Sequence, residues 1–595
     1  MTTYVAPVKD MQFVLRELAG LERLAELPAF AEATPELAEA VLEEAAKLAA
    51  GVLAPLNKTG DRGGAKLTPT GVVAADGFAE AYHQFVENGW NDLAGDSEYG
   101  GKGLPGVIAA AAVEMWNSAN MSFALCPLLT AGATEAIRHH ASSALKDRYL
   151  RKLISGEWTG TMNLTEPQAG SDLSAVQTKA VPERDHYRIF GQKIFITWGD
   201  HDMTDNIVHL VLARLPGAPE GVRGISLFLV PKVLPDAEGN LGERNDVRCV
   251  SIEHKLGIHA SPTCVMSFGD SKGAIGYLVG EENKGLAHMF TMMNEARQKV
   301  GLQGIGIAER AYQAARDYAK ERVQGRMAAQ KSGDRVAIIH HPDVRRMLMT
   351  MKSQIEAMRA FGYVLAADLD LAHGHPDESE RDRRQGRADL LIPVLKGWCT
   401  ELGVEIASLA IQVHGGMGFI EETGVSQYLR DARIAPIYEG TTGIQAADLV
   451  GRKLAADRGR AMAALIGEMR ALDARLAESE AGFAAIRSAL GEGVQALEQA
   501  TQWMLEASGR DLDAALAASV SYLMLTGFVC GGWQMARAAI IARAQVQAGT
   551  DIAFHAAKIA TATFYAEQIM PKAVGLLGVI RSGASTALTI REEYL

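Results

Sequence analysis

The spacing of apolar residues changes twice along this chain, and these changes restrict the fold more than any other feature. Up to about residue 155, apolar residues recur at helical intervals, as in "ELAEAVLEEAAKLAAGVLAPL". From Thr159 to about Val279, short β-branched or alternating runs such as "HYRIFGQKIFITW" are separated by Gly, Pro and Asp. Helical spacing then returns and holds to about Leu454. The sequence therefore predicts helices, a small sheet sandwich or barrel, and a second set of helices.

The last region of the chain, residues 455–595, is rich in Ala and carries helical spacing without a strand pattern. With 595 residues, the chain is long enough to bury several cores. The predicted divisions are an N-terminal extension (1–40), a helical domain (41–158), a β domain (159–281), a second helical domain (282–454) and an extra helical domain (455–595).

Charge, cysteine and histidine content argue against two classes of function. The net charge is −12 and the longest basic run is "RDRRQGR", so nucleic acid is not expected as a partner. The five cysteines form no C-x-x-C pair and no metal-ligand spacing, which is typical of buried thiols in a reduced cytosol. The histidine groups "RHH", "HH" and "HGH" lack a second ligand pair, so no metal site is predicted.

Two segments bear on targeting and membranes. The N-terminus, "MTTYVAPVKDMQFVLREL", contains acids and no long apolar core, unlike a signal peptide. Residues 514–536 contain no charge and are long enough to span a bilayer, but Ala, Ser, Thr and Gly keep their hydrophobicity modest. We therefore expect a buried helix there, no integral membrane span and a cytoplasmic protein. Contact with a membrane surface stays open.

The glycine-rich stretch "GGKGLPG" matches G-x-G-x-x-G through Gly101, Gly103 and Gly106. A dinucleotide site needs a strand before this motif and a helix start after it, within a βαβ unit. Here "NGWNDLAGDSEY" precedes the motif and Pro105 lies inside it. We expect a glycine-rich turn between helices.

Two stretches in the β domain are more specific. "MNLTEPQAGSD" (162–172) ends a strand in a turn rich in hydroxyl groups, and "GQKIFITWGD" (191–200) is a strand. Strand alternation places Phe195 and Thr197 on the same face. An aromatic ring and a hydroxyl beside a polar turn suit a flat ring system with polar edges, although the core of a sheet can show the same pattern.

Together, "LTEPQAGSD", "GQKIFITWGD", "NEARQKVG", "HGGMGFIEE" and "IYEGTTGIQ", in this order and spacing, resemble the acyl-CoA dehydrogenase family over about residues 40–455. The N-terminal extension and the helical tail are similar to a longer bacterial branch, which includes 3-(methylthio)propionyl-CoA and some fatty-acyl-CoA dehydrogenases. The resemblance implies an α+β fold: an N-terminal helical domain, a middle β-barrel or sandwich, a C-terminal four-helix bundle and an extra all-α domain.

The resemblance also implies FAD as cofactor, bound between the β domain and the second helical domain. Hydroxyl groups and loop backbone would bond the flavin edge, Phe195 would pack against its ring, and Arg322 of the partner subunit would reach the pyrophosphate. The glycine-rich turn "QVHGGMGF" would let backbone approach the adenosine diphosphate. The matching residues are Met162, Leu164, Thr165, Ser171, Phe195, Thr197, Arg322, Gln412, Gly415, Gly416, Thr441 and Gln445.

Glu439 matches the family's catalytic base, which removes the α-proton of an acyl-CoA thioester while a β-hydride passes to flavin. Hydrogen bonds to the thioester carbonyl would stabilise the developing negative charge, and a dry pocket would strengthen the base. Some branches carry the base at the position of Ala296, which is not an acid here. Arg297 matches an arginine near the base. The substrate-binding residues implied are Ser171, Asn294, Arg297, Tyr438, Glu439 and Gly440.

The implied function is an acyl-CoA dehydrogenase that passes electrons to an electron-transferring flavoprotein and forms trans-2-enoyl-CoA. The expected assembly is a homodimer, because in long members the extra helices cover the surface that shorter ones use to form a dimer of dimers. An acyl-CoA oxidase and a non-catalytic flavin- or CoA-binding assembly protein are the alternatives. The acyl group stays open between 3-(methylthio)propionyl or another short chain and a medium-to-long chain.

Overall fold

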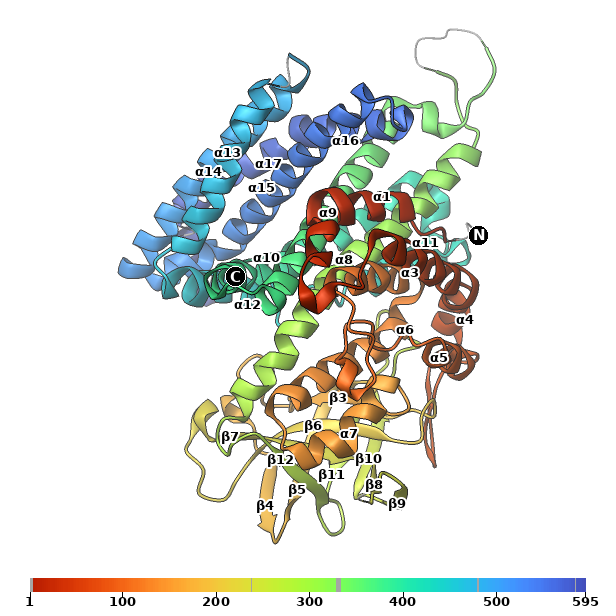
Figure 1. The fold of residues 1–595 in the computed structure, drawn as a ribbon, viewed down its shortest axis with the longest axis vertical. Coiled ribbons are helices and arrows are strands. Elements are labelled where there is room, and N and C mark those ends of the chain that lie inside the picture. The colour runs from red at the N-terminus through yellow and green to blue at the C-terminus, as the bar shows by residue number, and fades with distance from the viewer. Residues whose placement is uncertain (1–3, 237, 328–332, 479–480, 584) are drawn as a thin grey trace. The chain divides into compact units, whose positions relative to one another are not determined.

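The computed structural model describes residues 4–236, 238–327, 333–478, 481–583 and 585–595 (Figure 1). The chain forms two compact units, each made of separate segments. Unit 1 comprises Met1–Glu44, Pro105–Glu114 and Val300–Leu595, and unit 2 comprises Ala45–Leu104 and Met115–Lys299. Two long helices, α6 (Gly106–His140) and α8 (Gly285–Glu321), each contribute to both units.

The predicted β region forms an eight-stranded sheet in unit 2. The strand order is β10–β11–β5–β12–β7–β6–β3, and β4 pairs with both β5 and β6. Neighbours are antiparallel, except that β3 and β4 each run parallel to β6. The strands are β3 (Thr159–Asn163), β4 (Lys179–Glu183), β5 (His186–Thr197), β6 (Ile207–Arg214), β7 (Ile225–Pro231), β10 (Val247–Ile252), β11 (Thr263–Phe268) and β12 (Ala274–Val279), with a separate pair β8 (Val233–Pro235) and β9 (Leu241–Arg244).

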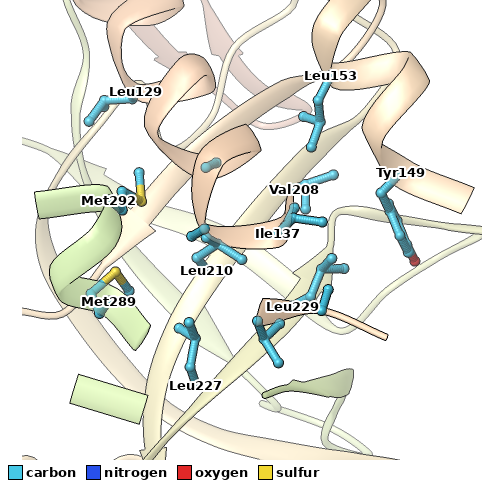
Figure 2. Packing of buried hydrophobic residues seen from close by; sticks show 14 of the residues in the cluster. Leu129, Ile137, Tyr149, Leu153, Val208, Leu210, Leu227, Leu229, Met289 and Met292 are labelled. Atoms are coloured by element: carbon cyan, nitrogen blue, oxygen red, sulfur yellow. The ribbon is translucent and has the colours of Figure 1, made fainter. Parts of the chain in front are cut away.

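Strand β6 is buried on both faces, which explains its continuous apolar run. Val208, Leu210 and Leu212 pack into one core, whereas Val211 and Ala213 pack into another. Successive side chains of a strand point to opposite faces, so one strand supplies both cores. Figure 2 shows the first core, where the sheet meets α6, α7 (Ser143–Ser155) and the start of α8. Its labelled side chains are Leu129, Ile137, Tyr149, Leu153, Val208, Leu210, Leu227, Leu229, Met289 and Met292.

One short hairpin departs from the sequence prediction. Helices alone were expected before residue 155, but β1 (Lys66–Thr68) and β2 (Gly71–Val73) pair as an antiparallel hairpin. The two residues between the strands are Pro69 and Thr70, and Gly71, the first residue of β2, has a φ of 136°. Strands of three residues carry too few positions to reveal alternation, so only the turn residues pointed to this hairpin. The other helices of unit 2 are α4 (Ala54–Gly63) and α5 (Phe78–Glu87).

Unit 1 contains the second helical domain from Val300 onward and the helical tail. Four helices correspond to the predicted bundle: α8, α9 (Pro342–Gly374), α10 (Glu378–His414) and α12 (Thr442–Asp448), which continues as a π-helix through Leu449–Leu454. This arrangement confirms the predicted fold class. The remaining helices are α1 (Val8–Phe13), α2 (Leu21–Ala25), α3 (Pro35–Leu48), α11 (Val425–Ala432), α13 (Arg460–Glu478), α14 (Ala484–Arg510), α15 (Leu512–Gln547), α16 (Ile552–Gln568), α17 (Met570–Ser582) and α18 (Ser585–Thr589).

Glycine residues let α8 and α10 pack closely. A Cβ added at Gly304 of α8 would lie 2.3 Å from the carbonyl oxygen of Cys399 on α10, and one at Gly301 would lie 2.6 Å from Leu395. On α10, a Cβ at Gly403 would lie 3.0 Å from the carbonyl oxygen of Gly304. Larger residues at these positions would separate the two helices. The backbone around Gly301–Gly304 is therefore held against α10.

Helix α15, which contains the uncharged residues 514–536, packs against α9, α10, α14, α16 and α17. In Figure 1 it lies beside α14 and α17. Gly527 of α15 sits against an aromatic ring of α10, where an added Cβ would come within 2.2 Å of Trp398. Among the described residues it is the one helix long and apolar enough to cross a membrane, and 67% of its most apolar window is buried. A core helix of a folded domain meets the same criterion.

A buried ion network joins distant segments of unit 1 around Arg359 of α9, which is 1% exposed. Its guanidinium donates to Glu114 of α6 at 2.5 Å, to Asp10 of α1 at 2.7 Å and to Glu309 of α8 at 2.8 Å. Lys558 of α16 donates to the other oxygen of Asp10 at 2.6 Å. The network thus ties the N-terminal segment and the helical tail to the bundle.

The network continues one turn along α9. Lys558 also donates to Glu356 at 2.8 Å, and Lys352 pairs with the second oxygen of Glu356. The hydroxyl of Tyr363 donates to Glu114 at 2.7 Å. Four carboxylates therefore share three cations in a buried region. Burial raises the pKa of Glu114, although Arg359 opposes this effect.

Replacing Arg359 with methionine should destabilise unit 1 strongly. The variant would keep side-chain volume but leave buried carboxylates without their cation, a loss of about 3–5 kcal/mol. Thermal or denaturant unfolding measures the effect. As a control, Arg510→Met removes an exposed pair with Glu506 and should cost less than about 1 kcal/mol. Equal stability losses for the two variants would contradict the role of the network.

The network should also make stability depend on acid pH through Asp10. Burial raises the pKa of this carboxyl, but Lys558, Arg359 and Lys352 outweigh burial and hold the pKa below its ordinary value. The folded state therefore binds fewer protons than the unfolded state, whose pKa is about 3.9. The stabilisation is complete above that value and is lost as pH falls below it. Asp10→Asn should show a smaller drop in melting temperature between pH 6 and pH 3 than the wild type. An equal drop in the two proteins would contradict the role of Asp10 in this pH dependence.

Candidate active site

The loop that carries Glu439 has a strained backbone. It connects α11 to α12, and Glu439 has a φ of 54°, followed by Gly440 with a φ of 88°. A left-handed conformation is unfavourable for a residue with a Cβ and persists only where surrounding contacts enforce it. The Thr441 hydroxyl accepts from the backbone N–H of Ile444 at 3.2 Å and so caps α12. The capped helix fixes the end of the loop.

Two buried side chains hold the carbonyl groups of the loop. Gln445 donates through Nε2 to the carbonyl oxygen of Glu439 at 3.0 Å. Lys396 of α10 donates through Nζ to the carbonyl oxygen of Gly440 at 2.7 Å. Both side chains are fully buried. A side chain at position 440 would meet Gln445, since an added Cβ would lie 2.7 Å from its Nε2. These contacts account for the left-handed backbone conformation of Glu439 and Gly440.

The residues before Glu439 supply apolar walls. Ala435 and Pro436 are buried, and Tyr438 is partly buried. The Tyr438 hydroxyl donates to Oε1 of Gln303 on α8 at 2.5 Å. Burial, and then the neighbouring Glu439, raise the pKa of Tyr438 far above its ordinary value, so its hydroxyl keeps its proton. The loop between α11 and α12, residues 433–441, is therefore held from both α8 and α10, and it is called the base loop below after the predicted role of Glu439.

In unit 2, the turn after β3 lies beside strand β5. The backbone N–H of Ile194 donates to the carbonyl oxygen of Thr165 at 2.9 Å. Phe195 has a φ of 59° and is 59% exposed, a strained and uncovered position for an aromatic residue. The register between β5 and β11 shifts at this point. Ile196 is buried while Phe195 and Thr197 are more exposed, so these two share the outer side of the strand.

A buried ion pair shapes the turn that carries Thr165 and Ser171. The Glu166 carboxylate accepts from Lys193 at 2.8 Å, from the Thr178 hydroxyl at 2.6 Å and from the Gln177 backbone N–H at 2.8 Å. Lys193 also donates to the carbonyl oxygen of Leu164 at 2.9 Å. Burial lowers the pKa of Lys193 to about 8 against the attraction of Glu166. The Glu166–Lys193 pair therefore holds both ends of the turn against β5.

These surroundings fit a flat cofactor with polar edges. The uncovered Phe195 ring lies near partly exposed Thr165 and Thr197, which offers an apolar face and hydroxyl groups. Leu164 belongs to the core shown in Figure 2 and Met162 packs against it, so their side chains face that core. Ser171 is exposed in the same turn. Flavin has this combination of an apolar ring and polar edge atoms.

The other predicted site residues fall at helix ends and on α8. Arg322 is exposed directly after α8, and Gln412 is exposed near the end of α10. Gly415 and Gly416 follow in an exposed turn, where an added Cβ would meet nothing within 4 Å. On the unit 2 part of α8, Asn294 is partly buried and Arg297 is 4% exposed. The predicted residues thus form separate groups in the two units.

Four residues of these groups were not anticipated: Lys396, Gln303, Glu166 and Lys193. Lys396 lies in the apolar run "LLIPVLKGWC", and Gln303 lies in "VGLQGIGI". A lone polar residue inside an apolar helical run indicates a buried group that needs a partner. The sequence contained this signal, but it could not show which group each buried side chain binds.

Comparison with known families agrees with this architecture. Four family profiles match: acyl-CoA dehydrogenase N-terminal domain (residues 35–157), middle domain (161–271) and C-terminal domain (283–455), and acetyl-CoA dehydrogenase C-terminal like (462–591). The chain therefore belongs to the acyl-CoA dehydrogenase family. Membership confirms the predicted enzyme class and activity, and the predicted FAD cofactor on which this family depends.

Individual relatives cover nearly the whole chain. A 3-methylmercaptopropionyl-CoA dehydrogenase from Ruegeria pomeroyi is 50% identical over 96% of both chains. A broad-specificity linear acyl-CoA dehydrogenase from Mycobacterium tuberculosis is 35% identical over 96% of both chains. The crystal structure of an acyl-CoA dehydrogenase complexed with FAD from Bacillus anthracis has the same fold, with a TM-score of 0.74 and 20% identity over 96% of this chain and 91% of that one. The predicted resemblance to a long bacterial branch is confirmed.

Lys396→Met should slow flavin reduction by acyl-CoA on the order of 10- to 100-fold, because small displacements of catalytic groups have effects of this size. The substitution keeps a long side chain but removes the donor to the Gly440 carbonyl. Anaerobic stopped-flow absorbance measures the rate, and the flavin spectrum of the purified protein reports FAD content. Lys572→Met, an exposed residue paired with Glu405, is the control and should react like the wild type. An unchanged rate in Lys396→Met would show that the loop holds its conformation without this contact.

Proposed function

We propose that this enzyme oxidises 3-(methylthio)propionyl-CoA, or a short acyl-CoA of similar length, to the trans-2-enoyl-CoA. The observation that carries this proposal is the 50% identity, over 96% of both chains, to a dehydrogenase of 3-methylmercaptopropionyl-CoA, which contains the same acyl group. Oxidation of medium-to-long linear acyl-CoA is the second candidate. It is favoured by the 35% identity to a broad-specificity linear acyl-CoA dehydrogenase.

In the proposed mechanism, Glu439 removes the α-proton of the thioester. The proton moves from the α-carbon to a carboxylate oxygen, and the C–H electron pair is shared with the adjacent carbonyl. A carboxylate alone is too weak a base for such a proton, so the developing negative charge needs hydrogen-bond donors. We assign one of these donors to the backbone N–H of Glu439. The held carbonyl groups of Glu439 and Gly440 keep this backbone in one conformation.

Apolar residues beside the base limit access of water. Ala435 and Pro436 are buried, and Tyr438 presents a ring with its hydroxyl tied to Gln303. Excluding water strengthens electrostatic interactions within the site and strengthens a carboxylate as a base. Because Gly440 has no side chain, the substrate can approach the backbone of the loop at this position. Arg297, 4% exposed on α8, is proposed to tune the base.

FAD, when bound, would supply the acceptor for the β-hydride and a hydroxyl donor for the thioester carbonyl. In unit 2, we propose that FAD is bound by Thr165, Ser171, Phe195 and Thr197, together with the backbone of Met162 and Leu164. In unit 1 the residues are Arg322, Gln412, Gly415, Gly416, Thr441 and Gln445. Nε2 of Gln445 donates to the Glu439 carbonyl, while Oε1 is buried without a partner among the described residues. An amide with one open acceptor can bond both the loop and a ligand.

We further propose that the electrons pass to an electron-transferring flavoprotein, that the enzyme is a cytoplasmic homodimer, and that it binds neither nucleic acid nor a membrane as an integral protein. The net charge of −12 and the helical tail support these assignments. Sedimentation of the holoenzyme as a tetramer would contradict the dimer. Stoichiometric peroxide formed in air would identify an oxidase instead.

An anaerobic titration of the yellow protein with acyl-CoA thioesters from C3 to C16 and with 3-(methylthio)propionyl-CoA tests the substrate. The flavin band should bleach fastest with the methylthio compound or with chains of similar length. Fastest bleaching by a chain of ten or more carbons would support the second candidate. A protein that holds FAD but bleaches with no thioester would support the non-catalytic alternative.

Glu439→Gln should reduce the rate of flavin bleaching by about 10²–10⁴-fold, since an amide cannot accept the α-proton. The variant keeps the shape of the side chain, so FAD content and acyl-CoA binding should remain. Binding is measured by isothermal calorimetry and the rate by stopped-flow absorbance. Glu506→Gln, an exposed change on α14, is the control. A rate near that of the wild type in Glu439→Gln would assign the base to another acid.

A further inference from the structure

One polar group next to the base loop has no hydrogen-bond partner among the residues that the structure describes. Gln303 of α8 is 0% exposed, and its Oε1 accepts from the Tyr438 hydroxyl. Its amide nitrogen, Nε2, is buried and makes no hydrogen bond to any described residue. Leaving such a donor unpaired is unfavourable, and buried polar groups in folded proteins are nearly always paired. An unpaired donor at this place therefore calls for an acceptor that the described part of the chain does not supply.

The position of Gln303 is fixed rather than accidental. Gly301 and Gly304, on either side of it, pack against the backbone and side chains of α10. Six residues further along α8, Glu309 is held by Arg359. The helix therefore cannot rotate or withdraw easily to hide the amide. A buried water is a poor substitute as a permanent partner, because it needs two or more polar partners of its own.

The amide is also close to the reaction. Tyr438 directly precedes Glu439, so the bond between its hydroxyl and Gln303 places the amide about one tyrosine side chain from the base loop. An acyl group whose α-carbon lies at the Glu439 carboxylate extends a few bonds further. Beyond the thioester, a straight alkyl group offers no acceptor. The methylthio acyl group offers one, a thioether sulfur two bonds beyond the α-carbon, and thioether sulfur is a weak hydrogen-bond acceptor.

We propose that Gln303 is a specificity-determining residue whose amide N–H contacts the thioether sulfur of the acyl group. This inference rests on the proposed function and extends it: the site selects a sulfur-containing acyl chain over an all-carbon chain of the same length. A substrate with a methylene at this place buries the amide donor without a partner. Sites built to hydrogen-bond a substrate atom discriminate against analogues that lack it, since the donor is then left unpaired.

The sharpest comparison uses two thioesters that differ at one atom. 3-(Methylthio)propionyl-CoA and pentanoyl-CoA have the same number of chain atoms, with sulfur in one where the other has a methylene. The wild-type holoenzyme should show a higher kcat/KM for the sulfur compound, by about 10-fold for a weak acceptor. Gln303→Met keeps the length of the side chain but has no donor, and should bring the ratio of the two kcat/KM values close to one.

Two further variants separate the amide from its partner tyrosine. Gln303→Glu keeps an acceptor for the Tyr438 hydroxyl but offers no donor, so it should also lose the preference. Tyr438→Phe removes the hydroxyl but keeps the Gln303 amide, so it should retain most of the preference even if both rates fall. Flavin absorbance and melting temperature establish that each variant holds FAD and is folded. If Gln303→Met does not fold or does not hold FAD, Gln303→Glu takes its place in the comparison.

The outcomes separate this inference from the function on which it rests. If the wild type oxidises both thioesters and neither Gln303 variant changes the ratio, Gln303 does not determine specificity, while the dehydrogenase assignment stands. If Tyr438→Phe abolishes the preference as fully as Gln303→Met, the effect comes from the tyrosine, and the amide contact is excluded. If the wild type bleaches with neither thioester, the proposed function fails and this inference fails with it.

Discussion

The ion network around Arg359 is the contact on which the order of unit 1 depends. Three cations and four carboxylates from five helices meet in a largely buried cluster, with Lys352 at its more exposed end. Buried charges of this kind are tolerated only when each is paired in good geometry, so the network permits few alternative helix arrangements. Glu309 fixes α8, Glu114 fixes the start of α6, and Lys558 fixes the helical tail. The chain ends are thereby built into the bundle rather than appended to it.

This constraint reaches the base loop through α8 and α10. Glu309 sets the position of α8 on α9, and the glycines at 301, 304 and 403 bring α8 against α10. From this pair of helices, Gln303 holds Tyr438 and Lys396 holds the Gly440 carbonyl. The strained conformation of Glu439 is thus maintained by contacts from two helices that the network and the glycines keep together.

Much of the fold could be predicted from residue spacing, because strand and helix periods are properties of local sequence. The strands between Thr159 and Val279 and the helices around them lie where the spacing changes. The three-residue strands β1 and β2 were too short to show a period. The shift in register at Phe195 was also missed, since a bulge depends on the partner strand. The ion network could not be predicted from the sequence. Asp10, Glu114 and Lys558 are far apart in the chain, and each alone resembles an ordinary charged residue.

The polar side chains around the base loop differ in how their hydrogen bonds are used, and this difference is informative. Lys396 gives a hydrogen bond to a loop carbonyl, and Gln445 does the same through Nε2, so both act on the backbone. Gln303 accepts from Tyr438, and its buried Nε2 has no acceptor among the described residues. If its only role were to hold the tyrosine, the amide N–H would stay unpaired, and an unpaired buried N–H opposes folding. A glutamine at this position is better explained when a bound molecule completes the set of hydrogen bonds than when the protein alone is considered.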